Sequence, residues 1–322
     1  MTRPNHTMSW HGVIPAITSS FDENFELDHA FMARHAIWLA EQGCSALVVS
    51  GSLGEAPTLS TEEKLSTIEN LVRTLQGRIP LVAGIPSLAT AEAERLARES
   101  VARGAQGLMV LPPYVYRGDW RETHAHLSKV LEATPAPCLL YNNPIAYGTD
   151  VLPEQIRELA DEFPNLEAVK ESSSDLRRFA AIRSWGSGRI SLLVGIDDQV
   201  LDGISAGAVG WIAGLANAIP RESVELFNLA EKGEDDSAIE LYHRLLPLLR
   251  MDSDPKFVQL IKFVQQEIGM GNARVRPPRL ELSAEEARHV RATIRSVLDQ
   301  AVTGRAPPDR RATRPRKSTR AA

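Results

Sequence analysis

Short apolar runs alternate along the chain with longer segments in which apolar residues recur at helical spacing. The runs are almost continuously apolar, which is typical of parallel strands buried on both faces. We expect strands at residues 13–18, 46–50, 80–83, 107–111, 138–141, 166–170, 191–195 and 209–213. We expect helices between and after them at residues 29–42, 61–76, 90–103, 120–133, 154–162, 175–184, 198–206 and 221–232.

Strands that alternate with helices indicate a parallel sheet with right-handed crossovers. Eight such units within roughly 230 residues predict an α/β fold of the closed (β/α)8 type, a TIM barrel. A doubly wound open sheet is the alternative architecture. No Gly-x-Gly-x-x-Gly sequence follows the first strand, which counts against a dinucleotide-binding fold of that kind.

Three more helical patterns follow the eighth unit, and they predict a helical extension packed on the barrel. These patterns lie at residues 235–249, 256–269 and 284–300. We therefore divide the chain into an N-terminal arm at 1–11, a barrel at 12–233, a C-terminal helical extension at 234–303 and a basic tail at 304–322. The tail is rich in Arg, Pro, Thr and Ala, so we expect it to be disordered and solvated. A tail that binds nucleic acid is the alternative.

The composition excludes several broad classes of protein. Of 322 residues 24% are charged, and the formal net charge is -5, so we expect no global attraction to nucleic acid. No apolar run is long enough to span a membrane. The opening residues, MTRPNHTMSW, lack the apolar region of a signal peptide, so we expect a cytoplasmic protein. Cys44 and Cys138 lie beside or inside apolar runs, which predicts buried free thiols.

Motifs for metal or nucleotide chemistry are absent from the sequence. The eight histidines show no grouping with nearby acids that would bind a metal ion, and His124 and His126 point in different directions on an expected helix. The chain has neither a Walker loop nor a Gly-x-Ser-x-Gly elbow. We therefore expect no metal and no organic cofactor.

The most informative single residue is Lys170, because reacting groups in TIM barrels lie at the C-terminal ends of the strands. Lys170 ends the sixth expected strand, so its side chain should project into the barrel mouth. Partial desolvation there favours the neutral amine, which attacks a ketone to give an imine. A lysine that simply reaches solvent from the strand end is the alternative.

Two neighbouring strand ends offer groups that would assist such a lysine. Tyr141 ends the fifth expected strand, and its phenol could move protons during imine formation. The turn Gly51-Ser52-Leu53-Gly54 offers successive backbone N–H groups that could bind a carboxylate. The Ser52 hydroxyl could relay protons to Tyr141.

These residues resemble a known family, the dihydrodipicolinate synthase and N-acetylneuraminate lyase family of class I Schiff-base lyases. The likeness runs over residues 12–298. It depends on the order and spacing of four motifs, which are Gly51-Ser-Leu-Gly-Glu, Tyr141-Asn-Asn-Pro, Val169-Lys-Glu-Ser and Gly195-Ile-Asp-Asp. The resemblance implies a homotetramer built from dimers, with a small 2-oxo acid as substrate.

The resemblance also implies roles for individual residues. Lys170 would form the imine, and Tyr141 would shuttle protons. Ser52 would supply the hydroxyl of a relay triad, and Tyr114 its other tyrosine, contributed across a subunit contact. The substrate-binding residues would be Gly51, Ser52 and Leu53, whose turn holds the carboxylate, together with Gly195 and Ile212, which line the pocket.

Two positions depart from the family pattern. Leu53 stands where the family usually has a second Thr or Ser, so one side-chain hydrogen bond to the carboxylate is missing. Ala146 stands where the synthases carry an arginine that grips the carboxylate of aspartate semialdehyde. Loss of a bidentate clamp should weaken binding of that second substrate. Specificity should depend on the loops around Ala146, Tyr147, Ser172 and Asn217.

The sequence therefore favours a Schiff-base lyase that acts on another 2-oxo acid or on a cyclic imino acid. The segments that start at His11, Gly104 and Ala216 look similar to the pyrroline-4-hydroxy-2-carboxylate deaminase subgroup. We expect a deaminase or dehydratase of that type or of the keto-deoxy-sugar-acid type. A pyruvate-dependent aldolase, the lysine-pathway synthase and a non-catalytic sensor of small acids are the alternatives.

Overall fold

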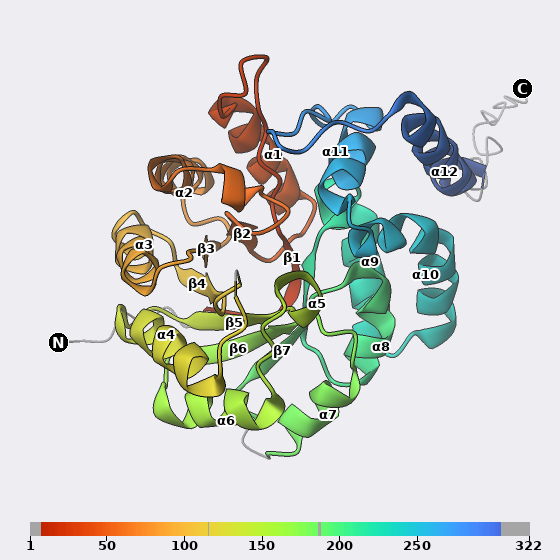
Figure 1. Ribbon diagram of the computed structural model, residues 1–322. Coiled ribbons are helices and arrows are strands. Elements are labelled where there is room, and N and C mark those ends of the chain that lie inside the picture. Colours follow the sequence, from red (N-terminus) through yellow and green to blue (C-terminus); the bar gives the residue numbers. More distant parts are fainter. Residues whose placement is uncertain (1–7, 115, 186–187, 304–322) are drawn as a thin grey trace, which may run out of the picture.

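The computed structural model describes residues 8–114, 116–185 and 188–303, with side chains described as far as residue 298. Eight parallel strands form a barrel with helices on its outside, as Figure 1 shows, so the predicted TIM barrel is confirmed. The tail predicted at residues 304–322, like the first seven residues of the arm, lies outside the described part. The strands are β1 (Gly12–Pro15), β2 (Leu47–Val49), β3 (Leu81–Ile85), β4 (Gly107–Val110), β5 (Cys138–Asn142), β6 (Leu166–Glu171), β7 (Ser191–Val194) and β8 (Gly210–Ala213).

Each strand pairs with its neighbours in the order β1-β8-β7-β6-β5-β4-β3-β2. The first and last of these meet through a bridge between Ala16 and Val48 and through the Ile17 N–H, which donates to the Val48 carbonyl at 2.8 Å. The ring of strands is thereby closed. A closed parallel sheet brings all eight C-terminal strand ends to one rim.

The helices follow the expected order with small shifts at their ends. They are α1 (His29–Glu41), α2 (Thr61–Leu75), α3 (Thr90–Ala102), α4 (Trp120–Glu132), α5 (Pro144–Tyr147), α6 (Pro153–Glu162), α7 (Arg177–Arg183), α8 (Val200–Ser205), α9 (Pro220–Glu231), α10 (Asp235–Leu249), α11 (Phe257–Glu267) and α12 (Ala284–Thr303). Sequence patterns fix some starts well: Ser60 caps α2 and forms a capping box with Glu63. The short helix α5 was not predicted.

The apolar residues form two layers because side chains alternate across each strand. In β1, for example, Val13 belongs to the layer between strands and helices, whereas Ile14 belongs to the barrel interior. Trp10 closes the N-terminal end of the barrel, where its indole N–H donates to Glu167 at 3.1 Å. The cysteines are free and buried, as expected.

Of the three helices after the barrel, α10 packs against α8 and α9, and α12 packs on α10 and α11; Figure 1 shows α10 beside α9 and α11 beside α12. A 3-10 turn, η4 (Arg250–Ser253), joins α10 to the segment before α11 and contacts another 3-10 turn, η2 (Asp197–Gln199), which follows β7. The extension therefore reaches the rim that carries the C-terminal strand ends.

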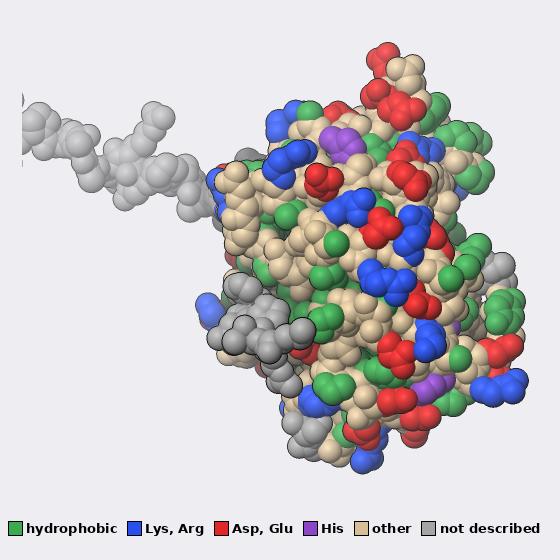
Figure 2. Space-filling model, turned by 90° about the vertical axis from the view of Figure 1, so that its left-hand side faces the viewer, with side chains coloured by type: hydrophobic (Ala, Val, Ile, Leu, Met, Phe, Trp, Pro, Cys, Tyr) green, Lys and Arg blue, Asp and Glu red, His purple; other side chains and the backbone are tan. Residues whose placement is uncertain are grey.

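Acidic and basic side chains are interspersed over the face drawn in Figure 2. Within the described ranges, no helix has both the length and the apolar character that crossing a membrane requires. Nor do the described residues bring three or more His, Cys, Asp or Glu side chains into an arrangement that could hold a metal ion.

Candidate active site

A cavity of about 570 Å³ opens at the rim formed by the C-terminal strand ends. Nearly every residue predicted for the site lines it: Gly51, Ser52, Leu53, Tyr141, Lys170, Gly195 and Ile212. Tyr114 is not among the lining residues, although its ring lies 5.3 Å from the ring of Tyr147, which does line the cavity. The structure thus brings together groups that are far apart in the sequence.

Lys170 projects from β6 into this cavity with only 7% of its surface exposed. It is paired in register with Tyr141 of β5, and its Nζ lies 3.9 Å from the centroid of the tyrosine ring. A Cβ added at Gly195 would lie 2.8 Å from Lys170 Cε, so a glycine at the end of β7 leaves space for the lysine chain. The amine and the phenol ring are therefore held side by side in an enclosed site.

The hydroxyl groups of the site are linked differently from the predicted relay. The Ser52 hydroxyl is hydrogen-bonded to the Tyr147 hydroxyl rather than to Tyr141. The Tyr141 hydroxyl accepts a hydrogen bond from Asn143 Nδ2 at 2.9 Å. Tyr147 packs its ring edge-on against that of Tyr141, with 5.7 Å between centroids. Burial, together with the neighbouring Tyr141 and Tyr114, raises the pKa of Tyr147 well above its usual range.

Tyr147 comes from α5, the helix of a single turn that the sequence pattern did not show. Asn143 caps this helix by accepting from the Ala146 N–H at 3.0 Å. Tyr147 was expected only as part of a specificity loop, and its position beside Ser52 depends on that turn. Asn217, expected in the same group, instead binds backbone groups with its amide and is fully buried.

The glycine turn that follows β2 leads directly into a buried acid, Glu55, which is anchored by residues of the C-terminal extension. Glu55, which adopts a left-handed conformation at φ 55°, is fully buried, and its carboxylate accepts from Lys262 Nζ at 2.9 Å and from the Arg276 N–H at 3.0 Å. In the described part of the chain, no acceptor contacts the backbone N–H groups of Ser52 and Leu53. Two preorganised donors are thus available to a carboxylate.

Two acids lie near the C-terminal ends of β7 and β8, and only one of them belongs to a predicted motif. Asp197 is buried and accepts from the Trp211 indole at 2.9 Å and from two backbone N–H groups, those of Gly214 and Leu215. Its own N–H donates to Asp252 Oδ2 at 3.2 Å. Asp252 lines the cavity, and burial raises its pKa to about 6 although the positive charge of Lys170 opposes the shift. No signal in the sequence pointed to Asp252, because η4 reaches the rim only through tertiary packing.

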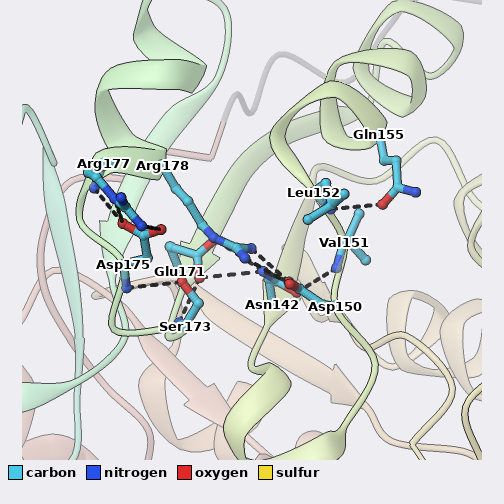
Figure 3. Close-up of polar contacts among 10 residues, drawn as sticks. All are labelled: Asn142, Asp150, Val151, Leu152, Gln155, Glu171, Ser173, Asp175, Arg177 and Arg178. Carbon is cyan, nitrogen blue, oxygen red and sulfur yellow. Dashed lines mark hydrogen bonds and ion pairs between the residues drawn. The ribbon is translucent and has the colours of Figure 1, made fainter.

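A second network, drawn in Figure 3, fixes the strand ends one residue beyond Tyr141 and Lys170. Asn142 donates to Glu171 at 3.1 Å, which joins β5 to β6. Asn142 also donates to Asp150, and Asp150 accepts two hydrogen bonds from Arg178, both 2.7 Å long. Burial raises the pKa of Glu171, whereas its hydrogen bonds and the nearby Arg178 oppose the rise. These contacts hold the strand ends that carry Tyr141 and Lys170, although none of the four residues lines the cavity.

Comparisons with known proteins agree with this geometry. A sequence model of the "Dihydrodipicolinate synthetase family" matches residues 9–297. A 4-hydroxy-tetrahydrodipicolinate synthase of Methanocaldococcus jannaschii is 32% identical over 277 residues, which cover 85% of this chain and 94% of the relative. Another, from Archaeoglobus fulgidus, is 32% identical over 291 residues, covering 89% and 98%. The solved structure of dihydrodipicolinate synthase from Aquifex aeolicus superimposes with a TM-score of 0.86 at 29% identity, covering 91% of this chain and 98% of that one.

Proposed function

The chain belongs to the dihydrodipicolinate synthetase family, whose members are class I lyases, and we propose that Lys170 forms its Schiff base with a small 2-oxo acid or cyclic imino acid. The observation that carries the proposal is the enclosed position of Lys170 beside the Tyr141 ring. A largely buried lysine amine that faces the cavity supplies the nucleophile that imine formation requires.

Other groups that line the cavity would bind the substrate and transfer protons during imine formation. The substrate carboxylate docks on the N–H groups of Ser52 and Leu53, next to Gly51. Lys170 attacks C2, and the Tyr141 hydroxyl moves the protons of the carbinolamine. The hydroxyl pair Ser52–Tyr147 lies beside this phenol and orients it through the ring contact. Gly195 and Ile212 form the walls at the lysine.

The imine then stabilises an enamine at C3, and we propose that a leaving group departs from C4, as in a dehydratase or in the deaminase of pyrroline-4-hydroxy-2-carboxylate. Ala146 supports this choice, because it lines the cavity with a methyl group where a synthase would need an arginine for a second carboxylate. Aldol cleavage of the C3–C4 bond uses the same enamine and is the second candidate.

A panel of substrates tests the choice. Pyrroline-4-hydroxy-2-carboxylate and keto-deoxy sugar acids should lose ammonia or water, and their kcat/KM should exceed that for condensation of pyruvate with aspartate semialdehyde by at least about tenfold. Lys170→Ala should abolish every one of these reactions. Faster condensation, or release of pyruvate from an aldol substrate as the main reaction, would contradict the elimination.

The assembly is part of the same proposal. We propose a homotetramer built from dimers, in which Tyr114 acts across a subunit contact beside Tyr147. Light scattering of the purified chain measures the assembly, and a monomer with full activity would contradict the role of Tyr114.

A further inference from the structure

One acid at the rim has no part in the imine chemistry. Asp252 belongs to η4, in the helical extension, yet its carboxyl group lines the same cavity as Lys170. A Cβ added at Gly214 would lie 2.5 Å from Asp252 Oδ1, so the carboxyl group sits directly over the residue that follows β8. Lys170 lies in the same way against Gly195, the residue that follows β7. Because β7 and β8 are paired neighbours, Asp252 and Lys170 occupy adjacent parts of one wall.

Only one of the two oxygens of the Asp252 carboxyl group is hydrogen-bonded to the described part of the chain. Among the described residues, Asp252 receives a single hydrogen bond, from the Asp197 N–H to Oδ2. Asp197 itself differs, since both of its oxygens are occupied by donors from the chain. Oδ1 of Asp252 is therefore available to a molecule in the cavity.

A second unsatisfied polar group lies on the same wall. The Ser172 hydroxyl is buried, lines the cavity and has no hydrogen-bond partner among the described residues. It borders Gly195, where an added Cβ would lie 2.0 Å from its Oγ. A buried polar atom without a partner is costly, so the wall is suited to a polar substituent of the substrate. A carboxyl oxygen and a hydroxyl together suit a hydroxyl group on the carbon beyond C3.

We propose that Asp252 is a catalytic residue that removes the C3 proton of the Lys170 imine and then protonates the leaving group at C4. The proposal rests on the proposed function. In the first step the C3–H bond breaks, the proton passes to the carboxylate, and the electron pair forms the enamine. In the second step the enamine electrons form the C3–C4 double bond, the C4–O bond breaks, and the oxygen takes the same proton and leaves as water. Asp252 returns to its carboxylate form and the nitrogen to its iminium form.

The charges around Asp252 suit a group that must both accept and donate a proton near neutral pH. Among the described residues, Lys170 of β6 and the N–H of Asp197 favour the carboxylate form of Asp252, and the acids Asp197 and Asp198 of η2 lie close to it. Burial and Asp198 favour the protonated form, and together these effects place the pKa at about 6.

Pyruvate tests the assignment without knowledge of the natural substrate. Its imine with Lys170 carries C3 protons, so wild-type protein should exchange the methyl protons of pyruvate in D₂O, as measured by proton NMR. In Asp252→Asn the amide oxygen still accepts from Asp197, so the fold should persist. We expect borohydride to trap the pyruvate adduct on Lys170 as in wild type, while the exchange rate falls by about 10²- to 10⁴-fold. Asp202→Asn, on the exposed side of α8, should change neither.

The pH profile supplies a second readout. Exchange by wild type should rise through pH values near 6, because the carboxylate is the proton acceptor, and the residual exchange by Asp252→Asn should lack that rise. The proposal would be overturned if Asp252→Asn still formed the adduct and exchanged the methyl protons at the wild-type rate. Loss of both adduct and exchange would also overturn it, since the residue would then act in imine formation. A wild-type protein that forms no adduct would instead refute the function on which the proposal rests.

Discussion

Replacing Lys262 with methionine would leave a buried carboxylate, that of Glu55, without its nearest cation. The two side chains are 2% and 0% exposed, and the ammonium lies 2.9 Å from Oε1. Burial lowers the pKa of Lys262, and Glu55 opposes that shift. Breaking one partner of a buried pair costs about 3–5 kcal/mol, because the remaining charge stays desolvated. Arg279, whose guanidinium lies 3.8 Å from Glu55, is too distant to replace the direct bond.

Urea and thermal unfolding measure this effect. Lys262→Met should lower the unfolding midpoint by roughly 6–20 °C, since a loss of about 3–5 kcal/mol shifts the midpoint by about 2–4 °C per kcal/mol in large single domains. The double variant Glu55→Gln/Lys262→Met should regain most of the loss, because it removes the charge and keeps an acceptor for the Arg276 N–H. We expect Lys262→Met also to reduce trapping of pyruvate, because the proposed carboxylate site is the glycine turn next to Glu55, and the double variant should restore it.

An exposed ion pair serves as a matched control, because it shows how much of the expected loss in stability depends on burial of the pair. Lys129 is paired with Glu132 at 2.8 Å, but both side chains are more than half exposed. Lys129→Met should therefore barely shift the midpoint, because water screens an exposed pair. The reasoning is refuted if Lys262→Met unfolds at the wild-type midpoint, or if the double variant is no more stable than the single one.

Three further predictions concern the site and the network beside it. Ser52→Ala and Tyr147→Phe should each slow imine formation, and the double variant should be no slower than the slower single variant, because each change removes the same hydrogen bond. Losses that add up in the double variant, as measured by single-turnover trapping, would contradict the pairing. Gly195→Ala should reduce trapping sharply, because the new methyl group would collide with Ser172 Oγ at 2.0 Å and with Lys170 Cε at 2.8 Å; normal trapping would contradict it. Arg178→Met should cost about 1–3 kcal/mol in urea unfolding, because it removes two charged hydrogen bonds; an unchanged midpoint would contradict the network's role.

The sequence predicted the parts of the site that depend on strand ends. Lys170 and Tyr141 lie next to the ends of neighbouring strands, so the barrel topology alone places them side by side. The glycine turn was predicted for the same reason, because it follows β2 directly.

The sequence did not predict contacts that depend on packing between distant segments. Asp252 reaches the rim because η4 packs on η2, and no local pattern encodes that contact. The Ser52 hydroxyl is hydrogen-bonded to Tyr147 and not to Tyr141, because α5 brings Tyr147 next to it. This helix has only four residues, which is too short to show a helical period in the sequence. Arg279 lines the cavity from a segment after α11 that has no regular structure.

The imine at Lys170 is tested most directly by borohydride trapping with pyruvate, followed by intact mass and peptide mapping. The account predicts one pyruvate-sized adduct per chain, on the peptide that contains Lys170, and none in Lys170→Ala. An adduct on another buried lysine such as Lys262, or no adduct with pyruvate or any acid of the panel, would contradict it.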